Sequence, residues 1–133
     1  MTNSFDAPSV PFFGAAIDAP RETANAVIFG APHGTPYPTI PNEPFATAPN
    51  ALRDALAEDS GWEHHWDFDL DGPILGDPDF ALFDAGNLRT NSDDGPTNRA
   101  KIRKATSDIV ANGGVPIMIG LSLIHISEPT RPY

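Results

Sequence analysis

The sequence predicts an α/β protein with a mainly parallel, doubly wound sheet, and three observations support this fold class. Short apolar runs alternate with segments of helical periodicity, and the apolar runs end at small residues, as expected of buried strands. The chain also holds 15 prolines in 133 residues, which are too many for a helical bundle. Because strands that alternate with helices form parallel sheets, we expect part of a three-layer αβα architecture, truncated relative to a complete domain.

Four segments are predicted as strands. Residues 25–30 form an apolar run closed by glycine, which is typical of a strand buried on both faces of a parallel sheet. Residues 66–70 and 80–84 are predicted as the second and third strands, the third ending at Ala85-Gly86. Residues 115–119 are predicted as the fourth strand. Four strands account for only part of a doubly wound sheet.

The first predicted helix follows a long proline-rich loop over residues 31–48. It begins at Pro49, because the missing N–H of proline costs nothing in the first turn of a helix. It ends near Asp59, before a glycine. Its apolar stripe consists of Leu52, Ala55 and Leu56.

The second predicted helix covers residues 97–112 and stops at Gly113-Gly114. Its apolar face consists of Ile102, Ala105 and Ile109. Half of the chain's eight Lys and Arg residues also fall on it, at Arg99, Lys101, Arg103 and Lys104. We interpret this basic cluster as a solvated helix face, and the alternative is a site for phosphate or an acidic substrate.

The domain organisation follows from composition. Residues 1–24 are rich in Pro, Ala and Ser and are predicted to form an N-terminal arm without regular structure, and residues 25–120 hold the α/β domain. Residues 121–132 match in full one translated frame of the mosaic-end adapter used in transposase-made DNA libraries. We therefore expect 121–133 to be a non-native tail. The alternative is a genuine strand, because apolar and polar residues partly alternate there.

Charge and composition exclude several functional classes. A net charge of −10 and a pI near 4.5 argue against nucleic-acid and anionic-membrane partners, which select basic surfaces. The absence of cysteine excludes a disulfide framework, a thiolate zinc site and a cysteine nucleophile. Residues 1–16 lack the pattern of a secretory signal, and no apolar run approaches membrane-spanning length. We expect a cytoplasmic protein.

An acidic segment offers a candidate calcium site. Asp67-Phe-Asp-Leu-Asp71-Gly72, followed by Pro73-Ile74, matches the first eight positions of an EF-hand loop. The twelfth position is Pro78, where an EF-hand has a bidentate Glu, and the flanks lack helical periodicity. We interpret the segment as an edge strand with a solvated acidic face. The alternative is a small calcium-binding or interaction module that uses Asp67, Asp69 and Asp71.

Three residues are candidate substrate-side groups at the carboxyl edge of the sheet, where α/β enzymes bind ligands: His33, Asp84 and Asn87. His33 follows the first strand, and the other two lie at the end of the third. The alternatives are a surface loop histidine and ordinary turn residues. His64 and His65 are adjacent and cannot both face one metal on a regular element, so we interpret them as surface residues.

Four motifs occur in order: Phe29-Gly-Ala-Pro-His-Gly-Thr-Pro-Tyr37, Ala48-Pro-Asn-Ala-Leu-Arg53, Phe83-Asp-Ala-Gly-Asn87 and Gly113-Gly-Val-Pro-Ile-Met-Ile-Gly120. Together they resemble the amino-terminal third of the agmatinase and arginase family, the ureohydrolases. The resemblance covers residues 26–120. Asn87 stands where the family has Asp, and the first loop is compacted around His33-Gly34, which leaves the choice of substrate open.

The resemblance implies an arginase-like fold and two manganese ions that activate a bridging hydroxide for attack on a guanidinium carbon, with release of urea. The family's metal ligands come from a Gly-Gly-Asp-(His/Asp)-Ser motif and from later segments. This chain reads Leu121-Ser122 after Gly120, so no catalytic or metal-binding residue is carried over. We therefore expect this chain to be inactive.

The resemblance also implies properties of a longer parent protein. Its substrate is expected to be a guanidino small molecule, with agmatine, arginine and guanidinobutyrate all open. It is expected to form a homo-oligomer without nucleic-acid or membrane partners. A calcium module and an interaction domain without catalysis are the competing classes.

Overall fold

The computed structural model describes residues 4–18, 21–34, 43–75 and 79–120. The predicted adapter-derived tail, or alternative strand, at 121–133 lies outside these residues. So do Pro78, the twelfth position of the EF-hand comparison, and residues 35–42 of the proline-rich loop.

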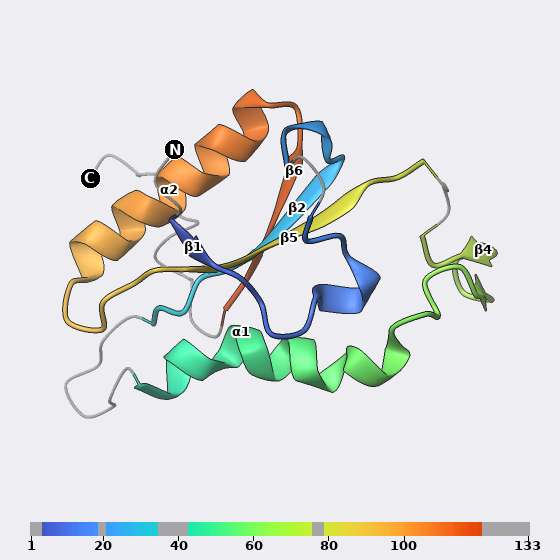
Figure 1. The fold of residues 1–133 in the computed structure, drawn as a ribbon, viewed down its shortest axis with the longest axis horizontal. Helices are drawn as coiled ribbons and strands as arrows, with labels where there is room; N and C mark the ends of the chain where they lie inside the picture. Colours follow the sequence, from blue (N-terminus) through green and yellow to red (C-terminus); the bar gives the residue numbers. More distant parts are fainter. Residues whose placement is uncertain (1–3, 19–20, 35–42, 76–78, 121–133) are drawn as a thin grey trace.

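A four-stranded sheet forms the centre of the molecule, with strand order β1-β5-β2-β6 (Figure 1). The strands β2 (Ala26–Gly30), β5 (Leu82–Leu88) and β6 (Val115–Ile119) are parallel, and β1 (Phe5–Asp6) pairs antiparallel with β5. Each residue of β2 is buried, as the sequence predicts for a central strand. The chain is therefore a mixed α/β protein with a mainly parallel sheet.

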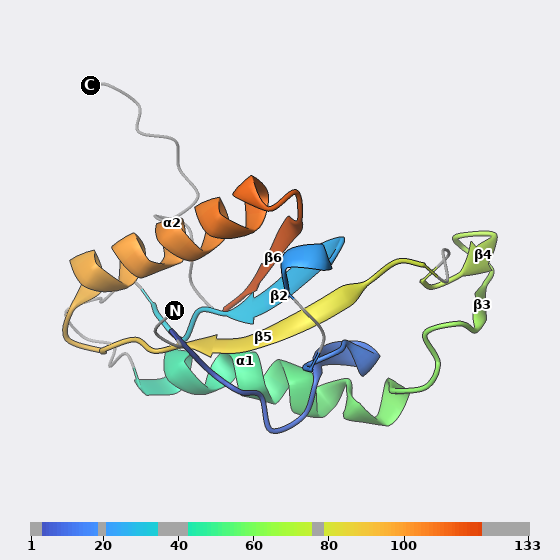
Figure 2. The same ribbon diagram turned by 45° about the horizontal axis from the view of Figure 1, so that its top comes forward.

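Two α-helices lie on opposite sides of this sheet, as Figures 1 and 2 show. Helix α1 (Glu43–Ala55) connects β2 to β5, and helix α2 (Gly95–Ala111) connects β5 to β6. The chain passes from β2 to β5 on one side and then crosses to β6 on the other side of β2. The direction in which strands are added to the sheet therefore reverses at β2. Open α/β sheets bind ligands beyond the carboxyl ends of the strands at such a reversal.

The predicted start of the first helix at Pro49 is wrong. Helix α1 begins at Glu43, and Pro49 lies in its interior. Pro44 takes the first-turn position, where a missing N–H leaves no broken hydrogen bond. The helix ends at Ala55 and is followed by a 3-10 turn at Ala57–Asp59, so its end agrees with the prediction better than its start does.

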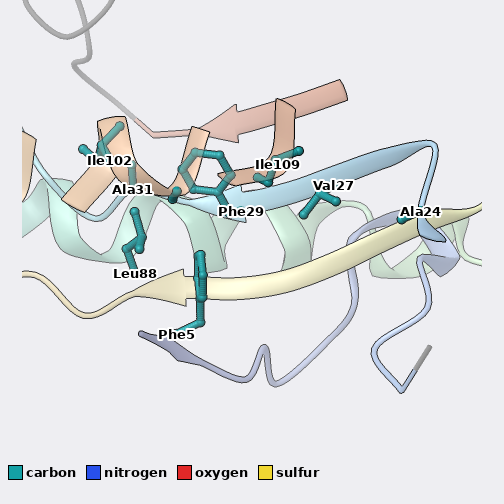
Figure 3. Packing of buried hydrophobic residues seen from close by; sticks show 9 residues of the cluster. Phe5, Ala24, Val27, Phe29, Ala31, Leu88, Ile102 and Ile109 are labelled. Carbon is teal, nitrogen blue, oxygen red and sulfur yellow. The ribbon is translucent and has the colours of Figure 1, made fainter. Parts of the chain in front are cut away.

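The hydrophobic core lies between the sheet and α2 (Figure 3). The predicted stripe of Ile102, Ala105 and Ile109 is buried there, which confirms the apolar face of α2. Phe29 of β2 meets Phe5 of β1 edge to face, with ring centroids 6.2 Å apart. The other members are Ala24, Val27, Ala31 and Leu88.

The ends of α2 are close to their predicted positions. The carboxylate of Asp94 caps the helix by accepting a hydrogen bond from the backbone N–H of Thr97. Gly113 has a φ of 84°, a conformation that favours glycine, and it follows the helix as the predicted stop.

Strand β5 continues past the predicted end at Ala85-Gly86. Ile28 is opposite Asp84 and Gly30 is opposite Asn87, so two residues of β5 face one residue of β2. This is a β-bulge, and Gly86 adopts its positive φ of 81° there. The glycine marks an irregularity within the strand and not its end. Asp84 therefore lies inside β5, which corrects its predicted place at a strand end.

Residues 66–70 do not form a strand of the main sheet, so that prediction is also wrong. Strands β3 (Trp66–Asp67) and β4 (Gly72–Pro73) form a separate two-stranded hairpin, which projects away from the sheet (Figure 2). The carboxylate of Asp67 accepts hydrogen bonds from the backbone N–H groups of Asp69 and Leu70, which stabilises a turn. Phe68 is 91% exposed, so its apolar side chain adds nothing to the core.

The N-terminal arm is more regular than the sequence predicts. Its strand β1 adds an antiparallel edge to the sheet, and Phe5 is buried. Two 3-10 turns follow, at Phe12–Gly14 and Arg21–Thr23. Within the described part of the chain, no helix is long and apolar enough to cross a membrane.

Candidate functional site at the carboxyl edge of the sheet

The carboxyl ends of the three parallel strands meet at one edge, because Gly30 of β2 is opposite both Asn87 of β5 and Ile119 of β6. An open groove of about 480 Å³ lies at this edge, between β1, the end of β5 and α1. Its polar lining consists of Asp6, Asn50, Asn87, Arg89 and Thr90.

A buried ion pair lies beneath the groove. The guanidinium of Arg53 donates from Nε to Asp84 Oδ2 and from Nη2 to Asp84 Oδ1, both at 2.8 Å. The side chains are only 1% and 0% exposed. The two oxygens of Asp84 also accept hydrogen bonds from the backbone N–H groups of Phe12 and Gly86. Asp84 thus joins α1 and the N-terminal arm to β5. The sequence predicts that its carboxylate faces a substrate, but the carboxylate is buried.

Asn87 is the predicted candidate that lines the groove. Its Oδ1 accepts a hydrogen bond from Nη1 of Arg53, and its Nδ2 donates to Oδ1 of Asn50, both at 2.8 Å. These two contacts fix the orientation of the amide. Asn87 therefore connects the buried Arg53–Asp84 pair to the groove through its hydrogen bond with Arg53.

His33 follows β2 as predicted, but it is buried, with 4% exposure, so the interpretation as a surface histidine is wrong. Its Nδ1 lies 3.2 Å from Nδ2 of Asn98 on α2. Burial lowers the pKa of His33, and the neighbouring positive charge of Arg99 lowers it further. Both effects favour the neutral imidazole.

Sequence reasoning missed Arg53 and Asn98, and the helical spacing contained a signal for both. Asn98 lies one turn before Ile102, on the same face of α2 as the buried apolar residues. Arg53 lies one turn after Pro49, which is also buried. A polar side chain at an apolar position of a helix needs an internal partner. Each of these two has one.

The described residues contain no group of three or more His, Asp or Glu side chains that could hold a metal ion. His64 and His65 are exposed as predicted, and the ring of His65 packs against Trp62 with centroids 4.1 Å apart. Lys104 of the basic cluster pairs with Asp108 of the same helix at the surface. Lys101 donates to the backbone carbonyl of Arg89.

No protein-family model matches the chain, and no curated protein is significantly similar to it. Function is therefore inferred from the motifs and from their arrangement in space.

Proposed function

We propose that residues 25–120 are the amino-terminal part of an agmatinase-like ureohydrolase, a manganese-dependent enzyme that hydrolyses a guanidino compound to an amine and urea. One observation carries this proposal. Residues of three motifs that are far apart in the sequence, Gly-Ala-Pro, Ala-Pro-Asn-Ala-Leu-Arg and Asp-Ala-Gly-Asn, meet at one point near the carboxyl edge of the sheet.

The contacts at this point involve the residues that define the motifs. Gly30 is packed so closely that an added Cβ would lie 2.8 Å from Cβ of Pro49 and would collide with Oδ1 of Asn87. Arg53, at the end of the second motif, binds Asp84 and Asn87 of the third. The fourth motif supplies β6, which pairs with β2 in continuous register. The motif residues therefore support one another physically, as expected if they belong to a single structural unit.

The residues present do not fit a pair of manganese ions. Both oxygens of Asp84 bind Arg53 and backbone N–H groups, and Nδ1 of His33 faces Asn98. We assign no catalytic step to this chain. In the proposal, residues 25–120 supply the scaffold and one wall of the site, while the metal ligands belong to sequence that continues from the Gly120 position in a parent protein.

The decisive experiment compares the 133-residue chain with the parent protein in a urea-release assay across a panel of guanidino compounds. With manganese supplied, the parent is expected to release urea from at least one of them, and agmatine or a close analogue is the first choice. The chain is expected to release none. Parent protein treated with a chelator is the matched control for the metal requirement.

Two results would contradict the proposal. If the metal-loaded parent releases urea from no compound of the panel, the family assignment is refuted. If the purified 133-residue chain releases urea, the expected inactivity is refuted. Sequencing the parent DNA across the Gly120 codon is a cheaper test. Continuation into Gly-Asp-(His/Asp)-Ser supports the proposal, whereas residues 121–133 in uncontaminated genomic DNA would remove the adapter interpretation.

The proposal includes a cytoplasmic location and a homo-oligomeric parent that binds a guanidino small molecule. The acidic net charge of −10 agrees with a site for cations and disfavours nucleic acid. The competing class is a calcium or interaction module built on Asp67, Asp69 and Asp71 of the hairpin. There Asp67 binds backbone N–H groups of its own turn.

A further inference from the structure

The side-chain amide of Asn98 has a defined orientation. Its Oδ1 accepts from the backbone N–H of Asn91 at 3.0 Å, and its Nδ2 donates to the backbone carbonyl of Asn91 at 2.6 Å. Rotating the amide by 180° would place donor against donor and acceptor against acceptor at Asn91. The second hydrogen of Nδ2 is then the one directed to Nδ1 of His33, 3.2 Å away.

A donor at Asn98 requires an acceptor at His33. We propose that His33 is a neutral imidazole with its proton on Nε2. It clamps the loop after β2 to Asn98 of α2, and through Asn98 to Asn91 in the loop before α2, until protonation at Nδ1 releases the clamp. An imidazolium donates from both ring nitrogens and has no acceptor for Asn98. Protonation would therefore replace a buried hydrogen bond by two opposed donors.

The clamp supports the groove at the carboxyl edge. Pro32 and Thr90 both line the groove. Pro32 directly precedes His33, and Thr90 directly precedes Asn91. The hydroxyl of Thr90 donates to the backbone carbonyl of Pro32 at 2.8 Å, so a second hydrogen bond joins the same two loops. Once the His33 contact is lost, this hydrogen bond is the side-chain link that remains between the two loops within the described part of the chain. Acidification is therefore expected to loosen one wall of the groove.

The charged groups near His33 lie on α2 and on the loop before it. On α2 the facing charge is Arg99, which opposes a second positive charge. The loop before α2 carries Asp93 and Asp94, and the carboxylate of Asp94 binds the backbone N–H of Thr97. On the side of α1, the neighbour of the loop after β2 is the uncharged ring of Phe45, which packs against Gly34.

The sign of the pH effect follows from linkage. The pKa of His33 is lowered in the folded state, so the unfolded or released state binds the proton more tightly. The stabilising contribution of the clamp is therefore complete above the unfolded pKa of about 6.5 and is lost as the pH falls below it. One proton limits the slope to about tenfold in the opening equilibrium per pH unit.

The test measures two quantities on the full chain, or on the longer parent protein where the chain aggregates: the ¹⁵N shifts of labelled histidine, which report the tautomer, and hydrogen exchange of the Asn91 N–H, which binds Asn98. The wild type is expected to show an Nε2–H tautomer at neutral pH. Its Asn91 protection, corrected for intrinsic exchange, is expected to fall by up to about tenfold per pH unit below about 6.5. The same spectra can be recorded on the longer parent protein.

Three variants separate the clamp from general acid effects. His33→Gln retains an acceptor that cannot be protonated, so its Asn91 protection is expected to be independent of pH across this window. His33→Ala removes the acceptor and is expected to show reduced Asn91 protection at every pH, without the wild-type pH dependence; if it does not fold, His33→Gln decides alone. His64→Gln alters an exposed histidine and should behave as the wild type does. An Nδ1–H tautomer, or the same pH dependence in His33→Gln, would overturn the proposal. Neither readout depends on catalytic activity, so the result stands apart from the ureohydrolase proposal.

Discussion

At the residue scale, the candidate site depends on polar side chains that occupy apolar positions. Arg53 and Asn98 lie on the buried faces of α1 and α2. Arg53 pairs with Asp84 of β5, and Asn98 pairs with His33, which follows β2. Burying such groups is favourable only when their hydrogen bonds are satisfied. These pairs therefore specify how each helix docks on the sheet.

The Arg53–Asp84 pair yields a direct prediction. Asp84→Asn leaves the guanidinium of Arg53 buried without a countercharge, and we expect a loss of about 3–5 kcal/mol in the free energy of unfolding. The exposed pair between Arg89 and Asp6 provides the matched control, because Arg89→Gln should cost no more than about 1 kcal/mol. Denaturant unfolding of the chain or its parent measures both. Equal losses in the two variants would show that the buried pair contributes no more than a surface pair.

At the element scale, the bulge in β5 sets the geometry of the carboxyl edge. It brings Asn87 opposite Gly30 while Asp84 stays opposite Ile28. Both Asp84 and Asn87 can then reach Arg53 of α1, at 2.8 Å each. A regular strand would have placed these two side chains on opposite faces of the sheet, because they are an odd number of residues apart.

Gly86→Ala tests the bulge. The residue has a φ of 81°, and an added Cβ would collide with the backbone carbonyl oxygen of Asp6, so the variant is expected to lose about 1–3 kcal/mol or more and to detach β1. Gly61→Ala is the control, since Gly61 has a φ of 98° with no atom near the added Cβ. Hydrogen exchange of the Arg89 N–H, which binds the carbonyl of Ser4, reports the pairing of β1. Retained protection in Gly86→Ala would contradict this role.

The acidic hairpin yields a second prediction at this scale. The carboxylate of Asp67 is engaged by Asp69 and Leu70 within the turn, so a calcium ion would compete with two hydrogen bonds. We expect calorimetric titration to reveal no calcium site tighter than about millimolar, the weak end for loop-type sites. Micromolar binding that disappears in Asp69→Ala would establish the calcium alternative instead.

At the scale of the whole molecule, the sheet has an exposed edge. Within the described residues, β6 pairs with β2 on one side and with no strand on the other. Val115 and Ile117 of β6 are 60% and 39% exposed, respectively. Unpaired apolar edge strands pair readily with other chains.

We therefore expect the chain, expressed alone, to aggregate or to remain partly unfolded. Val115→Lys places a charge on the exposed edge and is expected to reduce aggregation, because charged edge residues oppose strand pairing between chains. Light scattering and thermal unfolding measure these properties. A monodisperse wild-type monomer with a cooperative transition would show that residues 1–133 form a complete domain.

The sequence by itself determined the features that depend on local pattern. The apolar run of β2, the bounds of β6 and the buried stripe of α2 follow from residue periodicity and glycine stops, and the structure confirms them. The α/β class with a mainly parallel sheet follows from their alternation. Local pattern was misleading where one residue type has two uses. Pro49 has the pattern of a helix start and Gly86 that of a strand end, although both lie inside their elements.

Only the tertiary structure decided which polar residues are engaged with one another. Arg53 and Asp84 are 31 residues apart in the sequence, and His33 and Asn98 are 65 apart, so no local pattern links either pair. Their pairing depends on how the two helices dock on opposite faces of the sheet. Docking also buried His33 and Asp84, and it left Asn87 as the predicted candidate that lines the groove. Burial is a property of the packed molecule, because a side chain loses its water only when distant segments cover it.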